Sequence, residues 1–172
     1  RVYPTASFEG LYDRVILTTG SPLIQFTMAD VGSGLDLSTA TLTAWIGSGP
    51  VDLTPFVQFT PEGSGVRGTA AVPDSLAFPD GLVQLSVIVR DRAGNPGYAY
   101  VTIVVDTRAP QITSLVPANN DLLADLSNAT IRVEFGDGAE GLTAGVLASQ
   151  FRATLNGTDI TGMFSVTDTE AV

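Results

Sequence analysis

The sequence contains no cysteine, no histidine and no lysine, and all eight of its basic residues are arginine. Without cysteine or histidine the chain cannot form a disulfide, a zinc site of the usual nitrogen and sulfur type, or a Ser–His or Cys–His nucleophile pair. Without lysine it cannot form a Schiff base. Aspartate and glutamate are present, but no spacing sets two of them at a defined separation across a cleft. The sequence therefore predicts a protein that is not an enzyme.

Positive charge is scarce, because 18 acidic residues stand against 8 basic ones and the net charge is −10. This balance argues against nucleic acid as a partner and against binding to anionic membranes. No apolar run approaches the ~18 residues of a membrane-spanning helix, so membrane insertion is not expected. Aspartate outnumbers glutamate by 13 to 5. That excess fits a chain rich in turns, and Ca²⁺ favours the same short carboxylate.

What the chain does contain is an internal repeat. Residues 24–28 are followed by Asp30 and a glycine-rich turn, and residues 131–135 are followed by Asp137 and another such turn, an offset of 137 − 30 = 107. Residues 40–59 reappear in weaker form as residues 149–166. This second match aligns Leu42, Ala44 and Ile46 with Phe151, Ala153 and Leu155. A period near one hundred residues indicates a string of domains, because solenoid repeats recur every 20–50 residues.

Alternation of apolar and polar residues predicts β-strands. In residues 82–89, four apolar side chains at 83, 85, 87 and 89 share one face. Short strands separated by turn signals every 8–12 residues predict an antiparallel sandwich. The fold class is therefore all-β: tandem Ig-like antiparallel β-sandwiches, the second incomplete in this chain. Residues 1–107 form the first predicted domain, and residues 108–172 form the N-terminal part of a second, homologous domain.

Three short motifs carry a resemblance to a known family. They are D-R-A-G-N at residues 91–95, D-T-R-A-P at residues 106–110, and D-x-x-[SE]-G at residues 30–34 and 137–141. These motifs resemble bacterial Ig-like tandem domains, which are similar in architecture to cadherin and fibronectin type III modules and build stalks and adhesins. The resemblance implies an extracellular, cell-surface location and a non-enzymatic structural or adhesive role. The implied partners are neighbouring Ig-like domains of the same chain or of adjacent subunits.

Aspartates at the expected domain ends form the candidate metal site, with calcium as the one cofactor suggested. In an Ig sandwich the loops after the second and sixth strands lie at the end where the chain enters. In the first copy this should gather Asp30, Asp36, Asp91 and Asn95 near residues 1–4; in the second it should bring Asp106 near Asp137. Ca²⁺ requires six to eight oxygen ligands, which carboxylates and turn carbonyls can supply. The alternative is that these side chains simply cap turns.

Three aromatic residues form the candidate partner surface. Alternation points Trp45, Tyr98 and Tyr100 away from the core. Exposed aromatic side chains can anchor another subunit or a surface glycan. The alternative is that they only cover the outside of their strands.

Two other functions stay open. The second copy has strands without their partners, and unpaired edges can be completed by strands from another subunit. The protein would then be the subunit of a self-assembling filament or surface layer. The other alternative is an accessory, carbohydrate-binding module of a secreted enzyme, which would need a row of exposed aromatic side chains on one face.

Overall fold

The structure is a computed structural model that describes residues 2–47, 49–118, 130–136, 149, 151–167 and 170–172. The chain divides into two compact units, Arg1–Thr107 and Arg108–Val172, here called unit 1 and unit 2. The described residues are all β apart from short 3₁₀ turns: η1 (Thr54–Phe56), η2 (Asp74–Leu76) and η4 (Thr161–Met163). No helix in this part of the chain has the length and apolarity needed to span a membrane.

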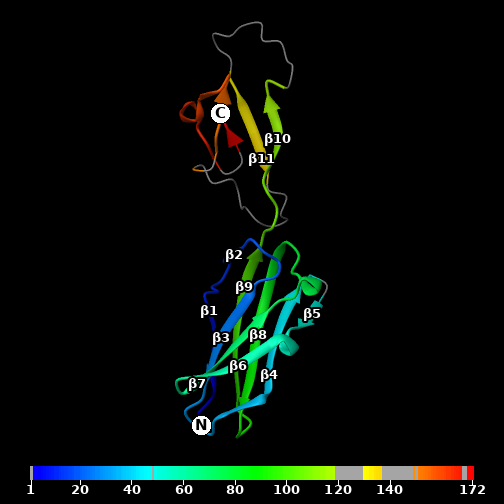
Figure 1. Ribbon diagram of the computed structural model, residues 1–172, viewed down its shortest axis with the longest axis vertical. Helices are drawn as coiled ribbons and strands as arrows, with labels where there is room; N and C mark the ends of the chain where they lie inside the picture. The colour runs from blue at the N-terminus through cyan, green and yellow to red at the C-terminus, as the bar shows by residue number, and fades with distance from the viewer. Residues whose placement is uncertain (1, 48, 119–129, 137–148, 150, 168–169) are drawn as a thin grey trace. The chain divides into compact units, whose positions relative to one another are not determined.

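Unit 1 is a sandwich of two sheets (Figure 1). The first sheet has the order β1 (Thr5–Glu9), β3 (Leu23–Ala29), β7 (Gly65–Ala71), β6 (Val57–Glu62). The second has the order β2 (Ile16–Leu17), β9 (Pro96–Val105), β8 (Gly81–Asp91), β4 (Leu35–Ile46), β5 (Gly49–Asp52). Neighbouring strands are antiparallel except β2, which runs parallel to β9. The start of the chain therefore gives one strand to each sheet.

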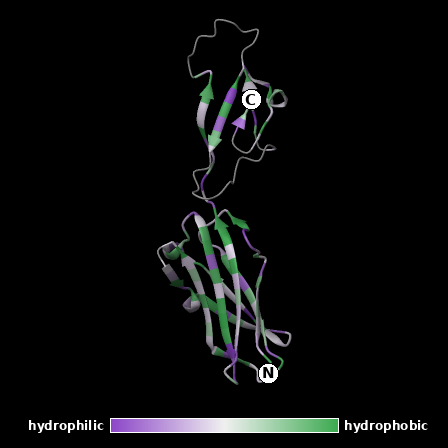
Figure 2. Ribbon diagram, turned by 180° about the vertical axis from the view of Figure 1, so that it is seen from behind, coloured by the Kyte–Doolittle hydropathy of each residue, from purple (hydrophilic) through white to green (hydrophobic). Residues whose placement is uncertain are grey.

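The core of unit 1 lies between these sheets and follows the predicted alternation. In β8 the four predicted inward residues are fully buried: Val83, Leu85, Val87 and Val89. The facing strand β3 buries Ile24, Phe26 and Met28. Burial of each such side chain stabilises the fold by about 1.5–3 kcal/mol. Figure 2 shows the resulting alternation of hydrophobic and hydrophilic segments along the strands.

One core contact requires a glycine. Phe26 on β3 lies directly opposite Gly68 on β7, and a Cβ atom added at Gly68 would sit 2.2 Å from the Phe26 ring. The ring therefore occupies the space that a side chain at position 68 would need. Phe26 also packs edge-on against Phe8 and Phe59, with ring centroids 6.3 and 6.5 Å away.

Unit 2 contains a smaller set of strands. A three-stranded antiparallel sheet has the order β10 (Gln111–Val116), β11 (Arg132–Gly136), β14 (Glu170–Ala171). A separate hairpin joins β12 (Thr154–Leu155) to β13 (Thr158–Asp159). The buried residues Val133, Phe135 and Ala171 form the core, and Phe151, Phe164 and Val166 pack against it. None of the strands described in unit 2 corresponds to β8 or β9.

The same capped turn occurs in both units. In unit 1 the carboxylate of Asp52 accepts a bond of 2.9 Å from the Thr54 N–H, and the Thr54 hydroxyl accepts one of 3.0 Å from the Leu42 N–H. In unit 2 the carboxylate of Asp159 accepts a hydrogen bond of 2.8 Å from the Thr161 N–H, and the Thr161 hydroxyl accepts one of 2.9 Å from the Ala153 N–H. The two turns are 161 − 54 = 107 residues apart, the offset that separates the strands β3 and β11.

These hydrogen bonds correct one part of the sequence alignment. Leu42 corresponds to Ala153, an offset of 153 − 42 = 111, and not to Phe151 as predicted. Leu155, which the alignment placed in the core, is 56% exposed. The error arises at the hairpin, where β12 and β13 turn tightly through Asn156 and Gly157, both with positive φ. Between the two hydrogen-bonded residues, Ala153 and Thr161, this hairpin is four residues shorter than the β4–β5 hairpin between Leu42 and Thr54. The shortening brings the offset back from 111 to 107 at the capped turn.

Candidate functional site

Two loops of unit 1 meet at the end where its chain begins. The loop after β3 and the β8–β9 turn are joined by a bond of 2.9 Å from the Arg92 N–H to the Gly34 carbonyl, and by one of 3.2 Å from the Ala93 N–H to the Ser33 hydroxyl. The Asn95 side chain donates a bond of 3.4 Å to the Val2 carbonyl. The structure thus brings together the Asp30 loop, the Asp91–Asn95 turn and the first residues, as the sandwich topology predicts.

Asp91 and Asn95 are buried and bonded to each other. Asp91 is 2% exposed, and its two carboxylate oxygens accept bonds of 2.7 Å from the Asn95 N–H and 2.6 Å from the Asn95 side-chain amide. Removal from water raises the pKa of the Asp91 carboxyl, but hydrogen bonds from the Asn95 side chain and backbone, the Ser33 hydroxyl and the Ala93 N–H lower it by more. Its pKa therefore lies below the ordinary value of 3.8. The charged carboxylate holds this turn in shape.

Asp30 and Asp36 also bond to their own loops. One oxygen of Asp30, Oδ2, accepts bonds of 3.0 and 2.6 Å from the N–H groups of Gly32 and Gly34. Its other oxygen, Oδ1, is buried and accepts no hydrogen bond from the described residues. Asp36 Oδ1 accepts bonds from the Ser38 N–H and hydroxyl at 3.2 and 2.6 Å.

This arrangement does not form a calcium cage from the described residues. No three acidic side chains among them converge on one point, whereas Ca²⁺ needs six to eight oxygens. The oxygens of Asp91 and one oxygen of Asp30 are already bonded to N–H donors. Asp106 follows β9 at the opposite end of that strand from Asn95, and its N–H donates to the Leu17 carbonyl. Asp137 lies outside the described residues.

The predicted aromatic residues lie on the outer face of the five-stranded sheet, in two groups. Trp45 on β4 is 49% exposed and stands opposite Gln84 of β8. Tyr98 and Tyr100 on β9 stand opposite Ile88 and Ser86, and their ring centroids are 5.7 Å apart. Strand β8 therefore separates Trp45 from the tyrosine pair. The three side chains do not form the continuous row that a carbohydrate-binding module would need.

The tyrosine pair belongs to a larger feature that the sequence did not reveal. All four tyrosines of the chain line two hollows in the seam between β1 and β9, and they are between 51 and 68% exposed: Tyr3, Tyr12, Tyr98 and Tyr100. Tyr3 and Tyr12 flank β1, and no periodicity links them to β9. Only the position of β1 beside β9, which is a property of the tertiary fold, brings them together.

Comparison with known proteins supports the fold. No family model matches the chain, and no curated protein matches it. Among solved structures, a three-domain titin fragment, I67–I69 in an E-to-A variant, aligns with 99% of this chain at 10% identity and a TM-score of 0.51, and this chain spans 54% of it. The GspB Siglec domain aligns with 63% of this chain and 59% of its own length at 20% identity, with a TM-score of 0.37. The titin fragment confirms the Ig-like fold, and the likeness concerns the fold alone.

Proposed function

We propose that this chain is a segment of a tandem Ig-like stalk on a prokaryotic cell surface, with a non-enzymatic spacer and adhesive role. The observation that carries the proposal is the capped turn of Asp52 and Thr54, repeated in unit 2 by Asp159 and Thr161. One small module recurs along the chain, each copy with its own core. Serial sandwiches of this kind extend a chain in space and need no catalytic site.

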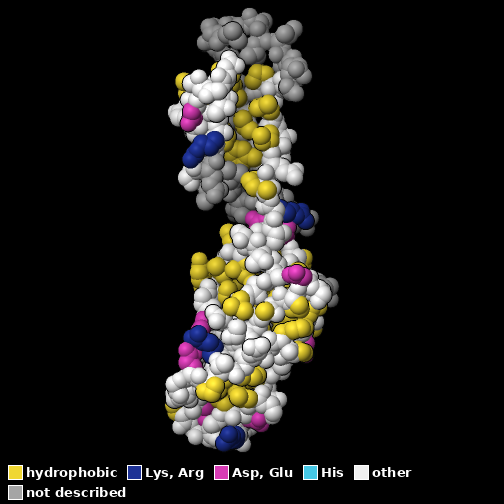
Figure 3. Space-filling view, viewed as in Figure 1, with side chains coloured by type: hydrophobic (Ala, Val, Ile, Leu, Met, Phe, Trp, Pro, Cys, Tyr) yellow, Lys and Arg dark blue, Asp and Glu magenta, His cyan; other side chains and the backbone are white. Residues whose placement is uncertain are grey.

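The surface of unit 1 is consistent with this role. Charged residues make up 15% of the sequence, and Figure 3 shows few of them on the face of unit 1 that it displays. The buried carboxylate of Asp91 is bonded within its own loops. The proposed extracellular, cell-surface location rests on the resemblance to bacterial Ig-like domains. The motifs at residues 30–34, 91–95 and 106–110 carry that resemblance.

A filament subunit completed by strand exchange is the second candidate. In that case strands from a neighbouring subunit would supply the counterparts of β8 and β9, the two strands of unit 1 that the described strands of unit 2 do not match. In unit 1 those two strands supply much of the core, including Val83, Leu85 and Ile103. Strands from a neighbouring subunit can fill such a position.

The denatured intact mass of the native protein separates these two candidates. The stalk proposal predicts a mass well above the 17.9 kDa of this chain, because the strands that complete unit 2 belong to the same polypeptide. A native mass near 17.9 kDa would instead favour the filament, because the completing strands would have to come from another subunit.

Calcium binding remains a prediction of the sequence. A ligand that binds only the native state raises the melting temperature. Calcium bound at the Asp30 and Asp91 loops therefore requires a higher melting temperature in millimolar CaCl₂ than in a chelator. It also requires Asp30→Ala and Asp91→Ala each to abolish that difference. Equal melting temperatures would leave these carboxylates with the loop-capping role that their hydrogen bonds describe.

A further inference from the structure

Part of the edge of β9 has no partner strand among the described residues. β2 pairs with β9 only at Val104 and Val105. Nearer the start of β9, the Arg14 N–H donates a hydrogen bond of 2.6 Å to the Thr102 carbonyl. The Thr102 carbonyl and the Val104 N–H both face β2. Because alternate residues of a strand face the same side, the N–H and carbonyl groups of Tyr98 and Tyr100 also point away from β8. These four backbone groups form an open edge.

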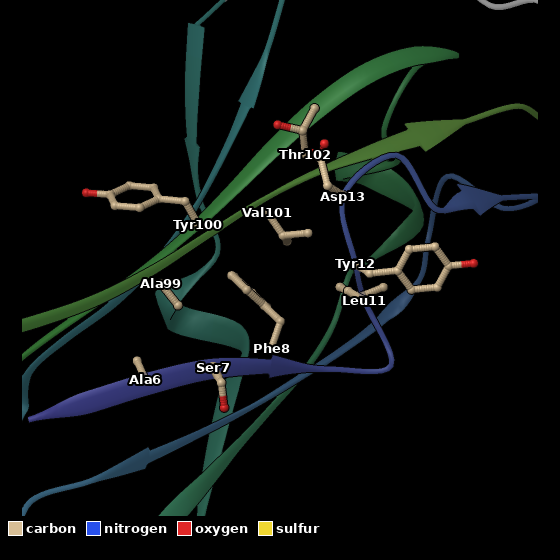
Figure 4. Close-up of a pocket in the computed structure, with 10 residues that line it drawn as sticks. All are labelled: Ala6, Ser7, Phe8, Leu11, Tyr12, Asp13, Ala99, Tyr100, Val101 and Thr102. Carbon is tan, nitrogen blue, oxygen red and sulfur yellow. The ribbon is translucent and has the colours of Figure 1, made fainter.

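The open edge borders the seam between the two sheets. One hollow of about 500 Å³ is lined by residues of β1 and β9 and by the segment between β1 and β2 (Figure 4). A second, of about 490 Å³, continues from it toward the chain start and shares Ala6. Phe8, Leu11 and Val101 lie between Tyr100 on one side and Tyr12 on the other in Figure 4. The seam is therefore a groove with an apolar floor and tyrosines along its sides.

Tyrosine is the residue type expected in such a groove if it binds a partner. Its ring offers a large contact area at a small cost in conformational entropy, and its hydroxyl can remain hydrated. All four tyrosines of the chain line the two hollows, while all four remain more than half exposed. Tyr98 and Tyr100 belong to β9 whereas Tyr3 and Tyr12 flank β1, so the tyrosines gather along the seam and not along one strand.

The backbone and the charges specify the occupant. An open strand edge is satisfied by an extended backbone, which adds to the sheet through main-chain hydrogen bonds. The chain already does this at the other end of β9, where β2 adds as a two-residue strand. Among the described residues that line the two hollows, Asp13 is the one charged residue. The complementary segment is therefore extended and mainly apolar, with a basic residue placed beside Asp13.

We propose that the groove between β1 and β9 binds an extended, mainly apolar peptide segment, which adds to the edge of β9 at Tyr98 and Tyr100 and continues the line of β2. The inference is independent of the cellular location proposed above, because the edge is a property of unit 1 alone. It concerns a different surface from the loops that carry the predicted calcium site.

The test is selection of a phage-displayed library of random dodecapeptides on the full chain, followed by amide hydrogen exchange with one selected synthetic peptide. Selected peptides should share alternating apolar residues and an arginine or lysine at one end. The bound peptide should slow exchange of the Tyr98 and Tyr100 amides at least tenfold, because strand addition places both N–H groups in hydrogen bonds. Side-chain stacking alone would leave those amides unprotected.

Two variants sharpen the test. Tyr100→Pro removes an outward N–H without removing a bond to β8, and should weaken peptide binding at least tenfold. Trp45→Ala on the same outer face should leave the affinity unchanged. The proposal is overturned if no peptide is selected, or if the selected peptides leave the exchange of Tyr98 and Tyr100 unaltered. It is also overturned if raising the protein concentration alone protects these amides, which would assign the edge to a second copy of the chain.

Discussion

The cross-strand pair Phe26–Gly68 of unit 1 is equivalent to the cross-strand pair Val133–Ala171 of unit 2. Val133 follows Phe26 by 133 − 26 = 107 residues, and each pairs with a small residue on the next strand. Where the inward residue is a phenylalanine, its ring takes the space of a Cβ atom and the partner is glycine. Where the inward residue is a valine, the partner is a fully buried alanine. The two residues of each pair are therefore coupled by volume.

This coupling predicts the outcome of a double-mutant cycle. Gly68→Ala should lower the free energy of unfolding by about 1–3 kcal/mol, because the added methyl group overpacks the Phe26 ring. Phe26→Val should also destabilise unit 1, because it leaves a cavity. The double variant should lose at least about 1 kcal/mol less free energy of unfolding than the sum of the losses of the two single variants, because it reproduces the valine–alanine pair of unit 2. Urea unfolding measures all four proteins; strictly additive losses would contradict the coupling.

The Asp91 carboxylate predicts a loss of stability in acid. Its pKa is lowered in the folded protein, by hydrogen bonds from Asn95 and the neighbouring loop that outweigh its burial. A carboxyl with a lowered folded-state pKa stabilises the fold above its unfolded pKa, here near 3.8, and this stabilisation disappears as the pH falls through the lower folded value. Asp91→Asn should therefore unfold more easily than the parent at pH 7 and should lose less stability between pH 5 and pH 2.5.

Asp74→Asn is the matched control, because it makes the same charge change at an exposed carboxyl on η2. Its melting temperature should follow that of the parent across the same pH range. If Asp91→Asn lost as much stability in acid as the parent and the control, the proposed role of the Asp91 hydrogen bonds would be wrong.

At the scale of elements, the capped turn after β5 fixes the position of η1 against β4. The Thr54 hydroxyl accepts from the N–H of Leu42, a fully buried residue. Thr54→Val removes the hydroxyl and leaves that N–H unpaired, which should cost about 1–3 kcal/mol. Thr54→Ser keeps the hydroxyl and should recover most of the loss. Chemical denaturation compares the two variants; because Val keeps the methyl group and Ser keeps the hydroxyl, a loss in Thr54→Ser as large as that in Thr54→Val, or larger, would contradict the role of the hydroxyl.

The strands could be predicted because alternation is a local property. Residues 82–89 face inward and outward as their sequence indicates, since each inward valine or leucine meets the same apolar interior. The alignment of the second copy failed at one element. A hairpin can shorten by four residues without disturbing the strands beyond it, and Asn156–Gly157 makes the shortest such turn. Sequence similarity was too weak there to place the deletion.

The candidate sites divide in the same way. The meeting of the Asp30 loop with the Asp91 turn follows from the order of strands in an Ig sandwich, so it could be predicted. The use of their carboxylates to hold N–H groups depends on loop geometry that no spacing encodes. The groove between β1 and β9 was missed because it exists only where the edges of two sheets meet, and its residues come from opposite ends of unit 1.

At the scale of the whole molecule, we propose that serial Ig-like units work outside the cell. Because the sequence contains no cysteine, no disulfide stabilises either unit, and the described residues are held by apolar cores, hydrogen bonds and ion pairs such as Arg67–Glu62. Unit 1 has a continuous apolar core between two sheets, and the described part of unit 2 repeats its turn and several of its strands. This organisation suits a spacer, and the open edge of β9 gives it a place to bind a partner.

The cellular location tests this account most directly. Because the chain has no lysine side chain for amine-reactive labels, the measurement is binding of an antibody against unit 1 to intact cells that produce the protein. A cytosolic protein serves as the control for leakage. For a stalk on the cell surface, we expect antibody binding to intact cells and loss of that signal after brief proteinase K treatment. A signal that appears only after the cells are lysed, together with the cytosolic control, would contradict it.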